Sequence, residues 1–170
     1  MATIKIEYGT ATTITMDLSA LATSASFLGG RESSQIDNTT NKYDDSIVQG
    51  LFTVGTTPTA NTSLNVYLWG SHTSLATTAL DVLDGTDSAE TFASTTALAN
   101  TVYLASVNPV VATTSDTSYI VKPFGVAQFF GGILPQYWGL FVAHNMTAAL
   151  RTNASNTDSF KYTGITYTVA

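Results

Sequence analysis

Apolar and polar residues alternate along most of this chain, which is the pattern of a β-strand with one buried face and one solvated face. At the start of the chain, Ile4, Ile6 and Tyr8 face one way. Lys5 and Glu7 face the other. The same alternation predicts strands over 14–18, 48–54, 64–69, 102–107, 119–124, 137–144 and 165–169. Weaker signals occur at 33–37 and at 160–162, and the latter is expected to begin the last hairpin.

About eight strands, separated by turns rich in Gly, Pro, Asn and Thr, are typical of an antiparallel β-sandwich. The jelly roll is the commonest sandwich with this number of strands. We therefore expect an all-β, jelly-roll-like sandwich that spans residues 1–170 as a single domain. Residues 1–18 are expected to form an N-terminal strand pair or an arm. A chain of 170 residues fits one domain and can bury a core without a disulfide or a metal.

Two short helices are predicted between the strands. Asp87 followed by Glu90 has the form of an N-cap with a glutamate at the third helical position, and two threonines a turn later limit the length of this helix. The segment 125–132 fits one or two helical turns closed by glycine. The stretch 70–100 is long and polar, which is typical of a surface feature with its own role.

The composition supports a β fold and excludes several classes of partner. Only 11% of the residues are charged, against a usual value of about 25%, and 30 threonines fill many of the polar positions. Threonine is β-branched and suits the solvated face of a sheet. The net charge is −6 with six Lys and Arg in all, so we expect no binding to nucleic acid or to an anionic membrane. The absence of cysteine excludes disulfides and thiol chemistry.

Residues that could carry catalysis or bind a metal are sparse. A catalytic triad would need His72 or His144 beside a carboxylate and a hydroxyl, and there is no Gly-x-Ser-x-Gly motif. A small hydrolase is therefore the least favoured hypothesis. The acidic stretch 81–90 offers four carboxylates that could bind a calcium ion, but its spacing favours a turn followed by a helix cap. We expect no enzymatic activity, no cofactor and no metal.

Aromatic residues offer a second kind of site. Tyr67 and Trp69 share one face of their predicted strand, opposite a row of leucine and valine. If exposed, this pair could stack against sugar rings. The favoured alternative is that both pack beneath a neighbouring loop or subunit, since Tyr and Trp suit interfaces, and that Trp138 belongs to the core.

Three motifs of this chain form a distinctive set. The first is Gly30-Arg31-Glu32-Ser33-Ser34-x-x-Asp37-Asn38-Thr39, continuing to Tyr43-Asp44-Asp45 and Val48-x-Gly50; the second is the acidic stretch 81–90; the third runs from Phe124 to Asn145 and contains Trp138-Gly-Leu-Phe-Val142. From about Gly29 to the end, the sequence resembles a family of small structural proteins of tailed bacteriophages. The resemblance implies a virion component with a jelly-roll fold that decorates or cements the outer capsid, and it assigns no catalytic residue.

The resemblance implies the major capsid protein as a partner, together with copies of this chain in a homotrimer or another symmetric cluster. The first residues alternate where a signal peptide would be continuously apolar, which fits synthesis in the host cytoplasm and a place on the capsid surface. The alternative is a tail- or fibre-associated adhesin that binds carbohydrate. We expect the contact at the chain ends and in an apolar segment, although most of its residues could instead form core: Phe129, Phe130, Ile133, Leu134, Tyr137 and Trp138.

Overall fold

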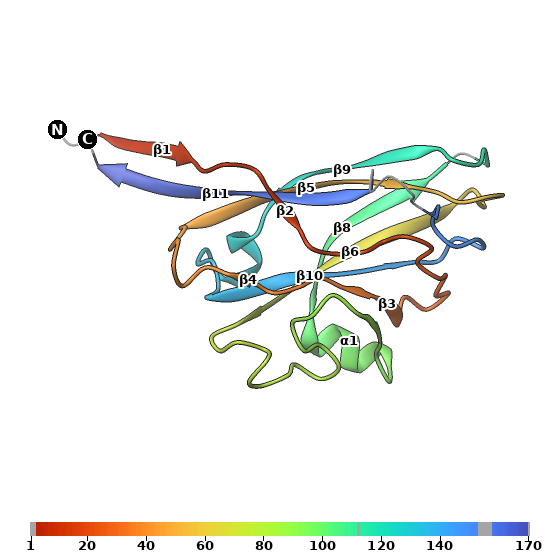
Figure 1. Cartoon of the computed structure of the whole chain (residues 1–170), viewed down its shortest axis with the longest axis horizontal. Coiled ribbons are helices and arrows are strands. Elements are labelled where there is room, and N and C mark those ends of the chain that lie inside the picture. The colour runs from red at the N-terminus through yellow and green to blue at the C-terminus, as the bar shows by residue number, and fades with distance from the viewer. Residues whose placement is uncertain (1–2, 112, 153–157, 170) are drawn as a thin grey trace.

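The computed structural model describes residues 3–111, 113–152 and 158–169 as an antiparallel β-sandwich with one short α-helix (Figure 1). Sheet A contains β1 (Ile4–Tyr8), β2 (Thr12–Ile14), β5 (Asp45–Thr53), β9 (Ser118–Gly125) and β11 (Ser159–Val169). Sheet B contains β3 (Gly29–Glu32), β4 (Ile36–Asp37), β6 (Thr62–Ser71), β7 (Ala89–Thr91), β8 (Tyr103–Val110) and β10 (Tyr137–His144). The helical segments are α1 (Thr95–Thr101) and the 3-10 turn η1 (Ala127–Phe130).

The strands pair like one long hairpin that is folded over on itself. β6 pairs with β8, β5 with β9, β3 and β4 with β10, and β1 and β2 with β11. All these pairs are antiparallel, and successive pairs belong alternately to sheet B and sheet A. This nested ladder is the jelly-roll arrangement, so the predicted jelly-roll-like sandwich is confirmed. The ten strands of this ladder occupy the eight strand positions of a jelly roll. One position is divided into β1 and β2, and another is divided into β3 and β4.

The main core lies between the two sheets. Trp138, Leu140 and Val142 point into it from β10, and all three are fully buried, which confirms the core position predicted for Trp138. They pack with apolar side chains of the other strands: Phe52, Leu64, Val66, Leu68, Val121 and Phe160. Burial of this apolar surface is the main force that holds the sheets together.

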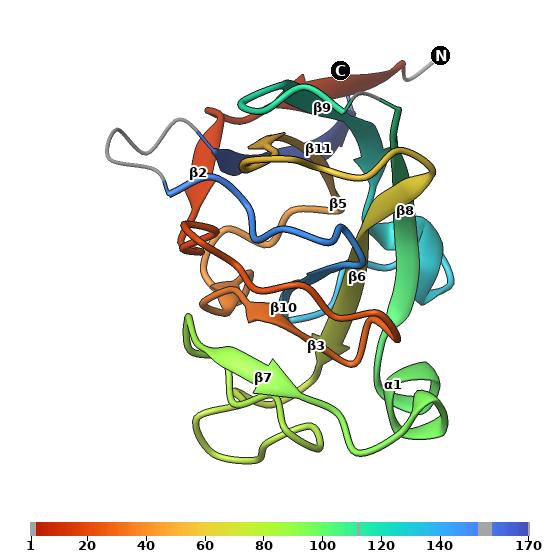
Figure 2. The same cartoon turned by 90° about the vertical axis from the view of Figure 1, so that its right-hand side faces the viewer.

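A second apolar cluster covers the outer face of sheet B. The chain between β6 and β8, which contains β7 and α1, folds over this face (Figure 2). Its apolar side chains turn inward onto Tyr67, Trp69 and Phe141, and they are Leu75, Leu83, Phe92, Leu98 and Val102. Sheet B is therefore covered on both faces, whereas Ile120 on the outer face of sheet A is 72% exposed.

The predicted helix start at Asp87 is wrong. Residues 89–91 form β7 against β3, and α1 begins after Ser94, whose Oγ accepts a hydrogen bond from the Ala97 N–H (3.1 Å). The Asp87 carboxylate is instead bound by Arg31, with Nε 2.6 Å from Oδ1. It also accepts the Asp17 N–H (3.1 Å), so it joins β3 to the N-terminal segment and does not cap α1. The short turn predicted within 125–132 is confirmed as η1.

The predicted last hairpin is also wrong, because β11 is one continuous strand of 11 residues. Gly164 lies within it, and the ring of Tyr43 rests on Gly164 where a Cβ would otherwise stand. The glycine therefore permits close approach of an aromatic ring and does not form a turn. The predicted N-terminal pair is placed differently too: β1 and β2 each pair with β11 and not with each other.

Candidate functional site

The predicted interface segment forms a loop that folds back on one end of sheet B. After η1, Gly131 and Gly132 adopt φ angles of 72° and 87°, which glycine reaches without strain, and the chain reverses. Pro135 and Phe130 then pack on Gly70 of β6. A Cβ at Gly70 would lie 2.6 Å from Pro135 Cγ and 2.7 Å from Phe130 Cε1. The loop can close on the sheet because position 70 has no side chain.

Aromatic rings from three elements meet on this loop. Phe130 contacts Tyr103 of β8 edge-on, with centroids 5.2 Å apart. Phe129 lies 6.5 Å from Tyr103 and 6.4 Å from Phe124 of β9. These separations are within the range of favourable aromatic pairs. Beside them Ile133 is 74% exposed. We refer to Tyr103, Phe129, Phe130 and Ile133 as the aromatic surface.

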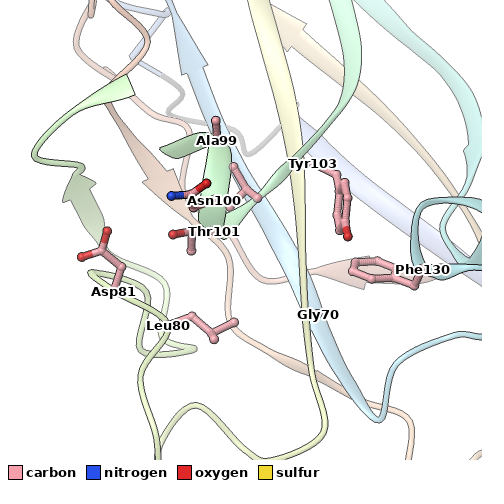
Figure 3. A pocket seen from close by; sticks show the side chains of 9 residues that line it. Gly70, Leu80, Asp81, Ala99, Asn100, Thr101, Tyr103 and Phe130 are labelled. Carbon is pink, nitrogen blue, oxygen red and sulfur yellow. The ribbon is translucent and has the colours of Figure 1, made fainter. Parts of the chain in front are cut away.

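Two hollows flank the Tyr103–Phe130 pair. The first, about 560 Å³, is lined by η1 and Ile133 and is mainly apolar. The second, about 370 Å³, opens toward α1, and there Asp81 and Asn100 contribute polar groups. Figure 3 shows Tyr103 and Phe130 side by side along one border of this second hollow, across from Asp81. The aromatic pair is therefore a ridge between two depressions. A protruding side chain of a partner could enter either depression.

The six predicted interface residues divide into surface and core. Phe129, Phe130 and Tyr137 are half-buried, and Ile133 is exposed. The other two are core residues: Leu134 is buried, and Trp138 is fully buried against Tyr162, with ring centroids 5.5 Å apart. Leu134 and Trp138 therefore present no surface to a partner in this structure.

Sequence reasoning missed the contribution of β8 to the aromatic surface. β8 is an edge strand of sheet B, and its Tyr103, Leu104 and Val107 each expose about half of their surface. Its pairing with β6 shifts register between Val66 and Tyr67, as a β-bulge does. Tyr103 and Leu104 lie before this bulge, opposite Leu68 and Tyr67, so they point to opposite faces of the strand. Both reach the surface because β8 stands at the end of the described sheet. The only sequence signal was the unbroken apolar run that starts at Val102.

The two described chain ends form another exposed apolar surface. Beyond Ile165, β11 pairs with β1 alone, as a two-stranded ribbon that extends past the neighbouring strands (Figure 1). We refer to residues 4–8 and 165–169 as the ribbon. Its register places apolar pairs on one face: Ile4 with Val169, Ile6 with Tyr167 and Tyr8 with Ile165. All of these except Ile165 are at least 52% exposed.

The aromatic pair that could have stacked on sugar is not on the surface. Trp69 is fully buried and Tyr67 is 7% exposed, because the segment 72–102 covers both. Tyr67 packs against Phe141, with ring centroids 5.9 Å apart. The structure thus confirms packing beneath a neighbouring loop and contradicts sugar stacking at this pair.

The two histidines occupy different environments. His72 is exposed after β6, whereas His144 is fully buried and its Nε2 lies 2.8 Å from the Leu21 carbonyl oxygen. Because a carbonyl can only accept, Nε2 carries the proton. Burial lowers the pKa of His144, which keeps the ring neutral. The described hydrogen bond of His144 thus goes to the backbone and not to a carboxylate or a hydroxyl.

The acidic stretch forms a turn that is tied to β3. Asp84 accepts a hydrogen bond from the Thr86 N–H, and Gly85 follows it with a φ of 81°. The buried Glu32 carboxylate accepts hydrogen bonds from the N–H groups of Asp84 (3.0 Å) and Gly85 (2.9 Å). Among the described residues, no three His, Cys, Asp or Glu side chains converge as metal ligands. The first two sequence motifs therefore pack directly on each other.

Comparison of the chain with protein-family models, with curated proteins and with solved structures finds no match. Within the described residues, no helix has the length and apolar character needed to cross a membrane.

Proposed function

We propose that this chain is a structural protein of a tailed-bacteriophage particle that decorates or cements the outer capsid by binding the major capsid protein. The observation that carries the proposal is the aromatic surface, a row of half-buried rings with an exposed isoleucine on a well-packed sandwich. Aromatic residues of this kind are enriched where proteins bind each other.

Composition supports the same proposal. Only 11% of the residues are charged, and the surface has few long Lys and Glu side chains that would lose conformational freedom on assembly. Jelly rolls serve in viral capsids and also in lectins, so the fold by itself does not decide between them. The resemblance of the three sequence motifs favours the capsid. The alternative, a tail adhesin, required Tyr67 and Trp69 to stack on sugar rings, and both residues are buried.

The first test is to count copies of the chain in purified particles by quantitative mass spectrometry. A decoration protein repeats with the capsid lattice, so we expect many copies, in a fixed ratio to the major capsid protein. Absence from particles, or a few copies per particle as for a tail protein, would contradict the proposal.

The second test uses a matched pair of variants. Ile133→Asp puts a charge on the aromatic surface, and Ile120→Asp puts the same charge on the outer face of sheet A at nearly equal exposure, 74% against 72%. Purified variants are added to particles that lack the chain. We expect Ile133→Asp alone to lose capsid binding, with unchanged thermal unfolding for both. Equal binding of the two variants would show that the aromatic surface is not the contact.

A further inference from the structure

The free edge of the ribbon is exposed and able to pair. β1 stands at the end of sheet A, and in the described part of the chain it pairs with β11 alone. All five of its residues are exposed. An edge strand carries a row of backbone N–H and C=O groups that can bond to a strand of another chain. A ribbon of two strands is also marginally stable in water by itself and gains from further strands.

The sequence of β1 is complementary to itself in one antiparallel register. When the pairing is centred on Ile6, Lys5 lies opposite Glu7 of the second copy, and Ile4 lies opposite Tyr8. The two-fold symmetry produces each of these pairs twice. Opposite charges and aliphatic–aromatic neighbours both stabilise adjacent strands.

Neighbouring registers are worse. A pairing centred on Lys5 would place that lysine opposite itself, and a pairing centred on Glu7 would oppose two glutamates. Like charges directly opposite each other are destabilising. Charged residues on an edge strand usually prevent indiscriminate pairing. Here they exclude the alternatives and permit the register centred on Ile6.

We propose that β1 pairs edge to edge with β1 of a second copy of this chain, so that two sandwiches share one continuous sheet across a two-fold axis. Residues directly opposite each other point to the same face of a sheet, so the apolar rows of both ribbons lie on one side. Lys5 and Glu7 of both copies lie on the other. This inference does not rest on the capsid proposal, because the pairing involves only this chain.

The test measures the oligomeric state of the purified full chain by sedimentation velocity across a wide range of concentrations. We expect a reversible dimer that weakens as salt is raised, because the charge pairs are exposed and screened. Lys5→Glu and Glu7→Lys each create like-charge pairs on both sides of the axis. We expect each single variant to raise the dimer dissociation constant about tenfold or more.

The decisive arm mixes the two variants. In a heterodimer of the Lys5→Glu chain and the Glu7→Lys chain, residue 5 of each chain lies opposite residue 7 of the other with the opposite charge. The equimolar mixture is therefore expected to form dimers although neither variant does so alone. A defect within one chain would not be repaired by mixing. The fold should survive in each, since all five residues of β1 are exposed and the two altered positions face the uncharged Thr166 and Thr168 on β11. Glu7→Lys also removes the exposed hydrogen bond from the Thr168 hydroxyl to Glu7 Oε1 (3.2 Å), and circular dichroism checks the fold of each variant.

Lys161→Glu is the matched control for Lys5→Glu, because it makes the same change of net charge at an exposed position within sheet A, away from the ribbon. We expect this variant to dimerise like the unaltered chain. An unaltered chain that stays monomeric at the highest concentration would overturn the proposal. So would dimers that persist in both single variants, or a mixture that remains monomeric.

Discussion

At position 32 the fold holds a carboxylate inside the protein, between β3 and the turn formed by the acidic stretch. Burial raises the pKa of Glu32 to about 7, because the charged form loses its hydration. The backbone N–H groups of Gly85 and Asp84 act in the opposite direction by stabilising the charged form. Desolvation is the larger effect.

A raised pKa makes the free energy of unfolding depend on pH. Below the ordinary pKa of about 4.5, Glu32 is protonated in the folded and the unfolded chain, and its contribution is fully present. As pH rises from there through about 7, the unfolded chain releases its proton first, and the contribution is lost. We expect Glu32→Gln to remove this loss, which is on the order of 3 kcal/mol, in urea unfolding between about pH 4 and pH 8.

His144 provides a contrast of opposite sign. Its pKa is lowered by burial, so its contribution is present above about pH 6.5 and is lost as pH falls below that value. The unaltered chain and the Glu32→Gln variant both keep this histidine. Its effect therefore cancels when their free energies of unfolding are subtracted at each pH. If the two pH profiles run parallel, Glu32 does not titrate in this range.

Among the elements, β11 shows most clearly how packing decides structure. A glycine near the middle of an alternating segment resembles a turn, yet at Gly164 the strand continues beneath the ring of Tyr43. We expect Gly164→Ala to lower the free energy of unfolding by about 1–3 kcal/mol, because the added methyl group overlaps that ring.

Urea unfolding of a double-mutant cycle measures this coupling. In a Tyr43→Ala background the ring is absent, so Gly164→Ala should cost much less there. An equal cost in both backgrounds would mean that the loss of glycine acts on the backbone and not through the ring.

The start of α1 allows a second prediction for an element. Ser94→Ala removes the side chain that accepts the Ala97 N–H, and we expect a loss of about 1 kcal/mol in the free energy of unfolding. Thr96→Ala, at an exposed position inside the helix, replaces a β-branched residue with a better helix former and should be neutral or slightly stabilising. Thermal unfolding of both variants checks the pair, and a similar loss in both would contradict the assigned cap.

Strand positions were predictable because alternation survives wherever a strand has one buried face. β5, β6, β9 and β10 each contain a predicted strand almost whole. The helix start was not predictable, because the choice of Asp87 depends on the distant Arg31. For the candidate site, an apolar run predicts the loop but not which side chains turn inward. Leu134 and Ile133 are neighbours in the sequence, and only the fold separates core from surface.

For the whole molecule, sheet B is shared by the two apolar clusters. Trp138 of β10 packs in the main core, and Trp69 of the paired strand β6 packs in the outer cluster. Neither cluster can lose its packing without exposing a face of the same sheet. We expect both to unfold in one cooperative transition.

Tryptophan fluorescence can follow each cluster separately, because the chain has two tryptophans, Trp69 and Trp138. Trp138→Phe leaves a reporter in the outer cluster, and Trp69→Phe leaves one in the main core. In each single-tryptophan variant, the urea transition by fluorescence should coincide with that by far-ultraviolet circular dichroism. An earlier fluorescence change at Trp69 would show that the covering segment detaches first.

The pairing of Ile4 with Val169 places the two ends of the described chain next to each other. A short peptide could therefore join them, and new ends could be opened in an exposed turn such as the one between β5 and β6. Such a circular permutant would convert the ribbon into a closed hairpin while leaving the outer edge of β1 free. Peptides or fluorophores fused at the relocated ends would then stand away from that edge, and the edge could be studied with no fused group beside it.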